Sequence, residues 1–395
     1  MTAVVVAAAV GLGACAAITD ETATDVIEAD DEPPTREGLA VEPPDSADLP
    51  SLDRSVADVD LADVHFNTFD GGSIPLSEAS PETVEGLRDR IPPVHRPRYV
   101  RVPAVDYLDD DDLVLGYVTD SGEAFAYPAR ILNFHEIVNE ELDGVPLVVT
   151  YCPLCRSGVV YDRRADGTEL TFGNTSALHD ADLVMYDHQT NSYWWQIAGR
   201  AIVGELTGDE LEVLPSSTTT WADWTERHPE SWVLSLDTGH ERPYTRDDPF
   251  TGYRDHLNDG RFPFPVNEEA ATDERLESGE EVLGVVIDGE ARAYPLRTLG
   301  DAVINDEVGG VPLLVVSRAE GPTGTVFDRR VDGQTLTFAL RDGAIVDDET
   351  GSTWSVDGLA SEGPLAGTQL EAVSSRFSFW FAFVAAFPDA TVARP

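Results

Sequence analysis

The chain contains two long stretches of nearly the same sequence, and this internal repeat constrains the fold more than any other feature. The first begins at Val114 as VLGYVTDSGEAFAYPARIL and later reads GVPLVVTYCPLCRSGVVYDRRADGTELTFG. The second begins at Val282 as VLGVVIDGEARAYPLRTL and later reads GVPLLVVSRAEGPTGTVFDRRVDGQTLTFA. The match continues beyond these runs, where Trp194 corresponds to Trp354. Such self-similarity predicts two copies of one structural unit.

The repeat also distinguishes positions that the two stretches share from positions at which they differ. Residues that both stretches share are most simply interpreted as scaffold. The positions of Cys152 and Cys155 hold Arg318 and Gly321 in the second stretch, so the thiols occur in the first stretch alone. Other side chains of functional interest are also confined to the first stretch, namely His135, His179, Met185 and His188.

The local sequence patterns predict a β-rich α+β fold in which two duplicated units pack as a pseudo-symmetric pair. Short β-branched and aromatic runs bounded by turn residues indicate strands. The Asp-Gly pairs at 166–167 and 332–333 predict tight hairpins. Residues 129–141 place apolar side chains on one helical face, and residues 220–228 show a similar pattern before a proline, so both predict helices.

The composition along the chain predicts five segments. These are a signal peptide at 1–15, a disordered acidic tether at 16–55, a first unit at 56–240, a connector at 241–280 and a second, degenerate unit at 281–395. The tether has too few apolar residues to order itself. The connector contains five Tyr and Phe residues, too many for a solvated linker, so it should pack against one or both units.

The N-terminal segment predicts export and lipid anchoring. An apolar run too short to span a bilayer ends in Leu-Gly-Ala before Cys15. This pattern resembles the lipobox of exported lipoproteins, in which the cysteine is lipidated after cleavage. We therefore expect Cys15 to carry the lipid and the chain to be anchored to the outer face of the cell membrane.

The charge composition favours a protein that works in very high salt. The formal net charge is −47, and all 26 basic residues are arginines. Molar salt shortens the Debye length to about 3 Å, which removes most of the self-repulsion of such a chain. A nucleic-acid partner is disfavoured because the sequence contains no basic patch to release phosphate counterions.

Cys152 and Cys155 remain as a CxxC pair at the end of an apolar strand, and three interpretations stay open. Soft thiolates joined by an imidazole suit copper or zinc. A bridge across so small a loop is strained and reducible, which would suit a thiol-disulfide oxidoreductase. The third interpretation is a binding scaffold in which the pair is merely structural. A sharp turn after Cys152 should direct both sulfurs to one side.

The segments LNFHEIVNEELDGVPLVVTYCPLCRSGVVYDR and DLVMYDHQTNSYWWQIAGRAIVGEL closely resemble signature segments of the family called domain of unknown function 3179 (DUF3179). The resemblance extends from about Asp58 to the C-terminus. It implies an exported or membrane-tethered protein and carries no known activity. His188 departs from the family pattern, which commonly has arginine there, so it is a poor ligand candidate.

These observations lead to one main hypothesis. The chain is expected to be a cell-surface lipoprotein that binds a soft metal, copper ahead of zinc, for metal handling or electron transfer. The expected ligands are Cys152, Cys155 and His135, with Met185 as a further thioether donor.

Overall fold

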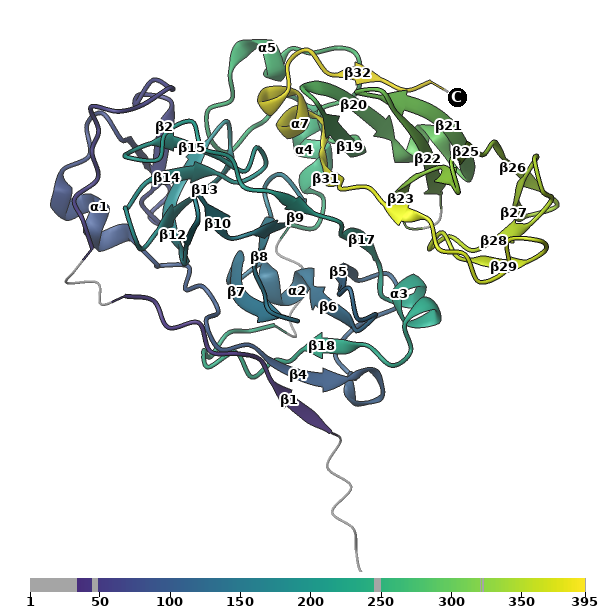
Figure 1. Ribbon diagram of the computed structural model, residues 1–395. Helices are drawn as coiled ribbons and strands as arrows, with labels where there is room; N and C mark the ends of the chain where they lie inside the picture. Colours follow the sequence, from purple (N-terminus) through teal and green to yellow (C-terminus); the bar gives the residue numbers. More distant parts are fainter. Residues whose placement is uncertain (1–33, 45–48, 245–249, 320, 322, 395) are drawn as a thin grey trace, which may run out of the picture. The chain divides into compact units, whose positions relative to one another are not determined.

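The computed structural model describes residues 34–44, 49–244, 250–319, 321 and 323–394 (Figure 1). The predicted signal segment and Cys15 lie outside these residues. Among the described residues, strands greatly outnumber helices, which confirms the β-rich α+β fold. Helices in this part of the chain are all too short or too polar to cross a membrane.

The first six-stranded sheet is built mainly from the chain before residue 235. Its order is β1, β4, β18, β6, β5 and β17. The strands are β1 (Thr35–Glu37), β4 (Arg98–Arg101), β18 (Trp232–Leu234), β6 (Ala124–Pro128), β5 (Leu113–Val118) and β17 (Ser217–Thr220). Because β1 pairs antiparallel with β4, this part of the expected tether at 16–55 is folded rather than disordered.

The second six-stranded sheet contains the long hairpin that positions part of the candidate site. Its order is β15, β14, β13, β12, β2 and β3. The strands are β15 (Arg200–Val203), β14 (Tyr193–Trp195), β13 (Asp182–Asp187), β12 (Phe172–His179), β2 (Val64–Asn67) and β3 (Ser73–Pro75). The register of the β12–β13 hairpin shifts between Asn174 and Ala177, which marks a bulge.

The third large sheet runs across the two predicted units. Its order is β32, β20, β19, β31, β9, β8 and β7, with β16 also paired to β9. From the second half come β32 (Thr391–Val392), β20 (Glu290–Pro295), β19 (Glu281–Ile287) and β31 (Arg376–Phe379). From the first half come β9 (Ser157–Asp162), β8 (Val145–Cys152), β7 (Ile137–Leu142) and β16 (Val213–Leu214). The junction is the pairing of Phe377 on β31 with Gly158 on β9.

The remaining strands form small sheets, and the helices are short. One four-stranded sheet comprises β21 (Ala302–Val308), β22 (Val311–Arg318), β23 (Thr323–Asp328) and β30 (Glu371–Ala372). The other comprises β26 (Phe338–Arg341), β27 (Ala344–Asp347), β28 (Thr353–Trp354) and β29 (Ala360–Glu362). Two small hairpins are β10 (Arg164–Ala165) with β11 (Thr168–Glu169), and β24 (Arg330–Val331) with β25 (Gln334–Thr335). The helices are α1 (Pro81–Leu87), α2 (Ala129–Leu132), α3 (Trp221–Arg227), α4 (Tyr253–Asn258), α5 (Glu268–Ala271), α6 (Leu296–Leu299) and α7 (Trp380–Ala386), with a 3-10 turn, η2, at Val102–Ala104.

The helix predicted at 129–141 is wrong beyond its first turn. Only α2 is helical, and Glu136 then adopts a left-handed backbone conformation with φ of 60°. The following residues form β7, which pairs with β8 along its whole length. Tertiary pairing therefore overrides the helical spacing of the apolar residues, because β7 is almost fully buried and its Ile and Val suit a strand.

Other predictions from the sequence are confirmed. The Asp-Gly pairs form the turns of the β10–β11 and β24–β25 hairpins, with positive φ at both residues of each pair. The helix predicted at 220–228 is α3, capped by the side chain of Thr220. The connector packs as expected, since Tyr253, Phe262 and Phe264 lie against the hydrophobic cluster that contains both cysteines.

The two halves make contacts of the same kind at corresponding residues. The side-chain amide of Asn139 exchanges two hydrogen bonds with the backbone of Phe172, and Asn305 does the same with Phe338. In the first half, the carboxylate of Asp187 accepts a hydrogen bond from the indole N–H of Trp194. The same bond joins Asp347 and Trp354 in the second half.

Candidate functional site

The CPLC sequence forms a tight turn between two buried strands. Cys152 is the last residue of β8 and pairs with Ser157, the first residue of β9. Arg156 completes the turn in a left-handed conformation with φ of 52°. Both cysteines are free thiols. The predicted turn after the strand is therefore confirmed, and it directs both sulfurs toward the same neighbouring element.

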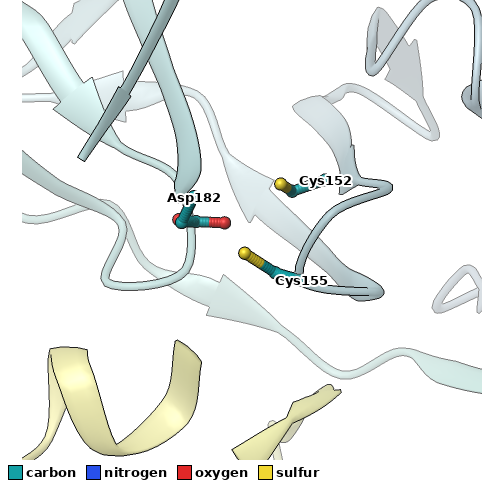
Figure 2. A group of neighbouring side chains, drawn as sticks. All are labelled: Cys152, Cys155 and Asp182. Carbon is teal, nitrogen blue, oxygen red and sulfur yellow. The ribbon is translucent and has the colours of Figure 1, made fainter. Parts of the chain in front are cut away.

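That neighbouring element is the tip of the β12–β13 hairpin. Asp180 and Ala181 form its turn with positive φ values, and Asp182 begins β13. Figure 2 shows the Asp182 carboxylate facing the two sulfurs. The ligand atoms of Cys152, Cys155 and Asp182 all lie within 4.8 Å of one another, and all three residues are buried.

Hydrogen bonds fix the carboxylate and the thiols. One oxygen of Asp182 accepts the backbone N–H of Ile197 at 2.9 Å, and the other lies 3.4 Å from the Ser157 hydroxyl. The sulfur of Cys155 lies 3.3 Å from the carbonyl oxygen of Ala181, whereas the sulfur of Cys152 is 3.9 Å from it. The site is thus positioned by both β9 and the β12–β13 hairpin.

The site gathers acidic groups in an apolar environment. Burial raises the pKa of the Cys152 thiol, and the negative charges of Asp182 and Glu136 raise it further. Burial likewise raises the pKa of the Cys155 thiol well above its usual value. Burial raises the pKa of Asp182 to about 7, although hydrogen bonds from Ile197 and the thiols oppose this shift. A bound cation would stabilise the ionised forms of these groups.

A pocket is lined by one of the two cysteines. Its volume is about 250 Å³, and its lining includes Cys152, Leu154, Glu136 and Asn174. The Asn174 amide donates a 2.7 Å hydrogen bond to Glu136, whose pKa burial raises to about 8. Cys155 does not line this pocket. A small molecule in this pocket would therefore lie beside Cys152 and Glu136 rather than beside Cys155.

The structure does not bring His135 to the thiols, so the expected Cys-Cys-His site is not formed. One ring nitrogen of His135 bonds the carbonyl oxygen of Pro92, and the other bonds the hydroxyl of Tyr244. Within the described part of the chain, the one group of three or more His, Cys, Asp or Glu ligands is the cysteine pair with Asp182. The expected helix is not formed there, because the chain turns into β7 after Glu136.

Met185 is fully buried in the hydrophobic cluster that also contains both cysteines. His188 is 6% exposed, and neither of its ring nitrogens has a hydrogen-bond partner. Its ring packs near Tyr186 and His95 rather than at the thiols.

Sequence reasoning missed Asp182 because the chain contains 73 acidic residues and none stands out alone. A signal was nevertheless present. The β12–β13 hairpin extends beyond its match in the second half, where β26 and β27 already turn at Asp342 and Gly343. Asp182 lies in the added part. An extension that accompanies the cysteines in one half points to a shared site.

Comparison with known proteins gives one match. The family model described as "Protein of unknown function (DUF3179)" matches residues 88–390, which include the CPLC turn and the Asp182 hairpin. No curated protein and no solved structure matches the chain.

Proposed function

The chain belongs to the DUF3179 family of proteins of unknown function, and we propose that it binds one metal ion through Cys152, Cys155 and Asp182. The observation that carries this proposal is the convergence of the three ligand atoms within 4.8 Å. Two sulfurs bound to one tetrahedral zinc ion at about 2.3 Å lie about 3.8 Å apart. A contraction of about 1 Å at most would therefore bring the ligand atoms to coordination distance.

The ligand set favours zinc ahead of copper, which reverses the order expected from the sequence. The thioether of Met185 suits copper, whereas thiolates joined by an imidazole suit copper or zinc. A carboxylate is a common zinc ligand, whereas copper(I) prefers sulfur and imidazole. Three protein ligands leave the fourth tetrahedral position for water or a small molecule. The 250 Å³ pocket beside Cys152 gives such a molecule a route.

A thiol-disulfide oxidoreductase is the second candidate, and the access of the pocket to Cys152 is the observation that favours it. The electrostatics oppose it. A nucleophilic cysteine needs a lowered pKa, and both thiol pKa values are raised by burial. A metal ion would convert the same thiols to thiolates, so the raised pKa values are compatible with the first proposal.

The two halves are proposed to be copies of one unit, and the metal site to be confined to the first. Matched hydrogen bonds at Asn139 and Asn305 support a common origin. The thiol positions hold Arg318 and Gly321 in the second copy. We also propose that the two units pack against each other as a pseudo-symmetric pair.

The proposed setting is the outer face of the cell membrane of a salt-adapted microbe, with lipid attached at Cys15. The lipobox-like sequence and the net charge of −47 support it. Firm anchoring would need two acyl chains, because one chain binds membranes only marginally.

Metal analysis of the full chain refolded in molar salt tests the proposed function. After incubation with zinc or copper(I) and removal of excess ion, we expect close to one bound ion per chain. Cys152→Ser, Cys155→Ser and Asp182→Asn should each lower this content strongly. His135→Gln is the matched control and should leave it unchanged, because the ring lies outside the ligand group.

Two results would overturn the metal assignment. One is a chain with reduced thiols that retains no metal. The other is a Cys152–Cys155 bridge that forms and breaks reversibly without metal, which would establish the oxidoreductase. Retention of metal in Asp182→Asn but not in Cys152→Ser would instead show that the two sulfurs suffice, as expected for copper(I).

A further inference from the structure

Three arginines from separate parts of the chain surround one buried carboxylate, Glu281. Arg297 Nε lies 2.7 Å from one Glu281 oxygen, and Arg156 Nε lies 3.3 Å from the other. Arg254 lies 4.0 Å away. These arginines come from α6, the CPLC turn and α4 respectively. The connector and both halves therefore contribute to one cationic cluster.

The contact with Glu281 leaves part of each arginine side chain exposed. The Glu281 side chain is 1% exposed, whereas those of Arg156, Arg254 and Arg297 are 35%, 37% and 44% exposed. Two of the three approach Glu281 through Nε, so their terminal nitrogens extend past it. Three positive charges facing one carboxylate leave a local excess of positive charge in a chain with a net charge of −47.

The other charged residues of the pocket balance it in formal charge. Its lining holds four arginines and four carboxylates, namely Arg130, Arg156, Arg254, Arg297, Asp111, Asp112, Asp255 and Glu281. Asp112 pairs with Arg130 at 2.7 Å. Affinity for an anion would therefore come from the convergence of the three arginines rather than from a net positive charge.

The cluster lies in a pocket with an aromatic wall. The pocket has a volume of about 440 Å³, within the usual range for small-molecule sites. Its lining includes all three arginines, Glu281, and several aromatic rings and a proline, namely Phe134, Tyr151, Pro153, Tyr244, Tyr253 and Phe379. The buried hydroxyl of Tyr253 has no hydrogen-bond partner among the described residues.

We propose that this pocket binds a small organic anion, with its carboxylate or phosphate held by Arg156, Arg254 and Arg297 and its apolar body against the aromatic wall. Guanidinium groups match the geometry of both oxyanions. Glu281 contacts Arg156 and Arg297 through Nε and Arg254 through a terminal nitrogen, and the ligand would take the remaining terminal nitrogens. The proposal is independent of the metal site, although Arg156 directly follows Cys155 in the chain.

Titration calorimetry on the full chain at one fixed salt concentration tests the proposal. The probes are benzoate, inorganic phosphate and the neutral benzyl alcohol. We expect benzoate to bind and benzyl alcohol not to bind, while phosphate shows how far the oxyanion alone suffices. Arg254→Gln should weaken benzoate binding about tenfold, the effect of one charge-assisted hydrogen bond. Arg341→Gln, which removes a surface pair with Asp348, is the matched control.

Glu281→Gln distinguishes a ligand site from a purely structural ion cluster. If the arginines bind a ligand, removal of the competing carboxylate should strengthen benzoate binding by roughly tenfold. If they serve only to neutralise Glu281, neither the parent nor any variant will bind the anions, and the proposal is overturned. Arg254→Gln keeps the test decisive should Glu281→Gln fail to fold, because Arg254 makes the longest of the three contacts. Binding retained in Cys152→Ser would separate this site from the metal proposal.

Discussion

Asn139 and Phe172 are joined by two hydrogen bonds of 2.8 Å each, one donated by the side-chain amide and one accepted by it. Asn139 lies on β7, beside the strand that ends in Cys152, and Phe172 begins the strand that leads to Asp182. This fully buried side chain therefore ties the sheet that carries the thiols to the hairpin that carries the carboxylate.

We expect Asn139→Ala to lower the free energy of unfolding by about 3 kcal/mol, because it leaves a buried N–H and a buried carbonyl without partners. The matched variant is Asn305→Ala, which breaks the same two bonds to Phe338 at an exposed position. Water can replace those bonds, so its loss should be about 1 kcal/mol or less. Denaturant unfolding in molar salt measures both. Equal losses would contradict the role assigned to burial.

The metal-free protein should lose stability as the pH rises from about 6.5 to 8. Burial raises the pKa of Asp182 and Glu140 to about 7 and that of Glu136 to about 8. The folded protein therefore holds protons that the unfolded chain has released, and stability falls with rising pH until each group ionises in the folded protein. Each contributes a slope of up to about 1.4 kcal/mol per pH unit.

Below pH 6.5, buried histidines oppose this trend. Burial lowers the pKa of His95, His135 and His188 to about 4, so the unfolded chain binds more protons there and stability rises with pH. We expect the two effects largely to offset one another between about pH 5 and 6.5. Thermal unfolding of Asp182→Asn should show a shallower decline above pH 6.5 than the parent. A parent whose stability rises through this range would contradict the assignment.

Metal binding should release protons, because the thiols are protonated at neutral pH in the metal-free protein. With the pKa values of both Cys152 and Cys155 raised, the apparent affinity for zinc should increase about 100-fold per pH unit between pH 7 and 8. Competition with a chromophoric chelator at several pH values measures this slope. In Cys155→Ser, one fewer proton should be released, and the slope should fall to about tenfold.

Two glycines at corresponding positions allow close packing of aromatic rings. A Cβ at Gly116 would lie 2.0 Å from the Trp224 ring, and one at Gly284 would lie 2.0 Å from the Phe383 ring. We expect Gly116→Ala and Gly284→Ala each to lower stability by about 1–3 kcal/mol through overpacking. Gly86→Ala, in α1 with open space around the added methyl, should instead raise stability by about 0.5–1 kcal/mol. Similar effects for all three would contradict this account.

Much of the local structure could be predicted from the sequence because short-range rules determine it. The Asp-Gly hairpins and the helix α3 follow from turn preferences and from the Thr220 cap. The segment 129–141 could not, since its apolar spacing suits both a helix and a buried strand. The choice depends on β8, a distant partner, and on the left-handed Glu136.

The candidate site was predicted only in part, because local sequence determines the CPLC turn but not the position of Asp182. Cys152 and Cys155 are close in sequence, so their shared turn could be inferred from the intervening proline. Asp182 reaches them only because a hairpin from another sheet extends to the turn. No local pattern marks such a residue among so many carboxylates, whereas comparison of the two halves would have shown the extension.

The pairing of β31 with β9 has a consequence for how the chain can be divided. The backbone N–H of Phe379 also donates to the carbonyl oxygen of Cys155, so the strand next to the thiols is completed by residues near the far end of the chain. A fragment ending before residue 281 would lack β31 and would leave an edge of β9 unpaired beside Cys152 and Cys155. Such an exposed edge would make the fragment prone to self-association. The second half, which holds Arg318 and Gly321 at the thiol positions, would thus have a structural role in covering the strand beside the thiols of the first.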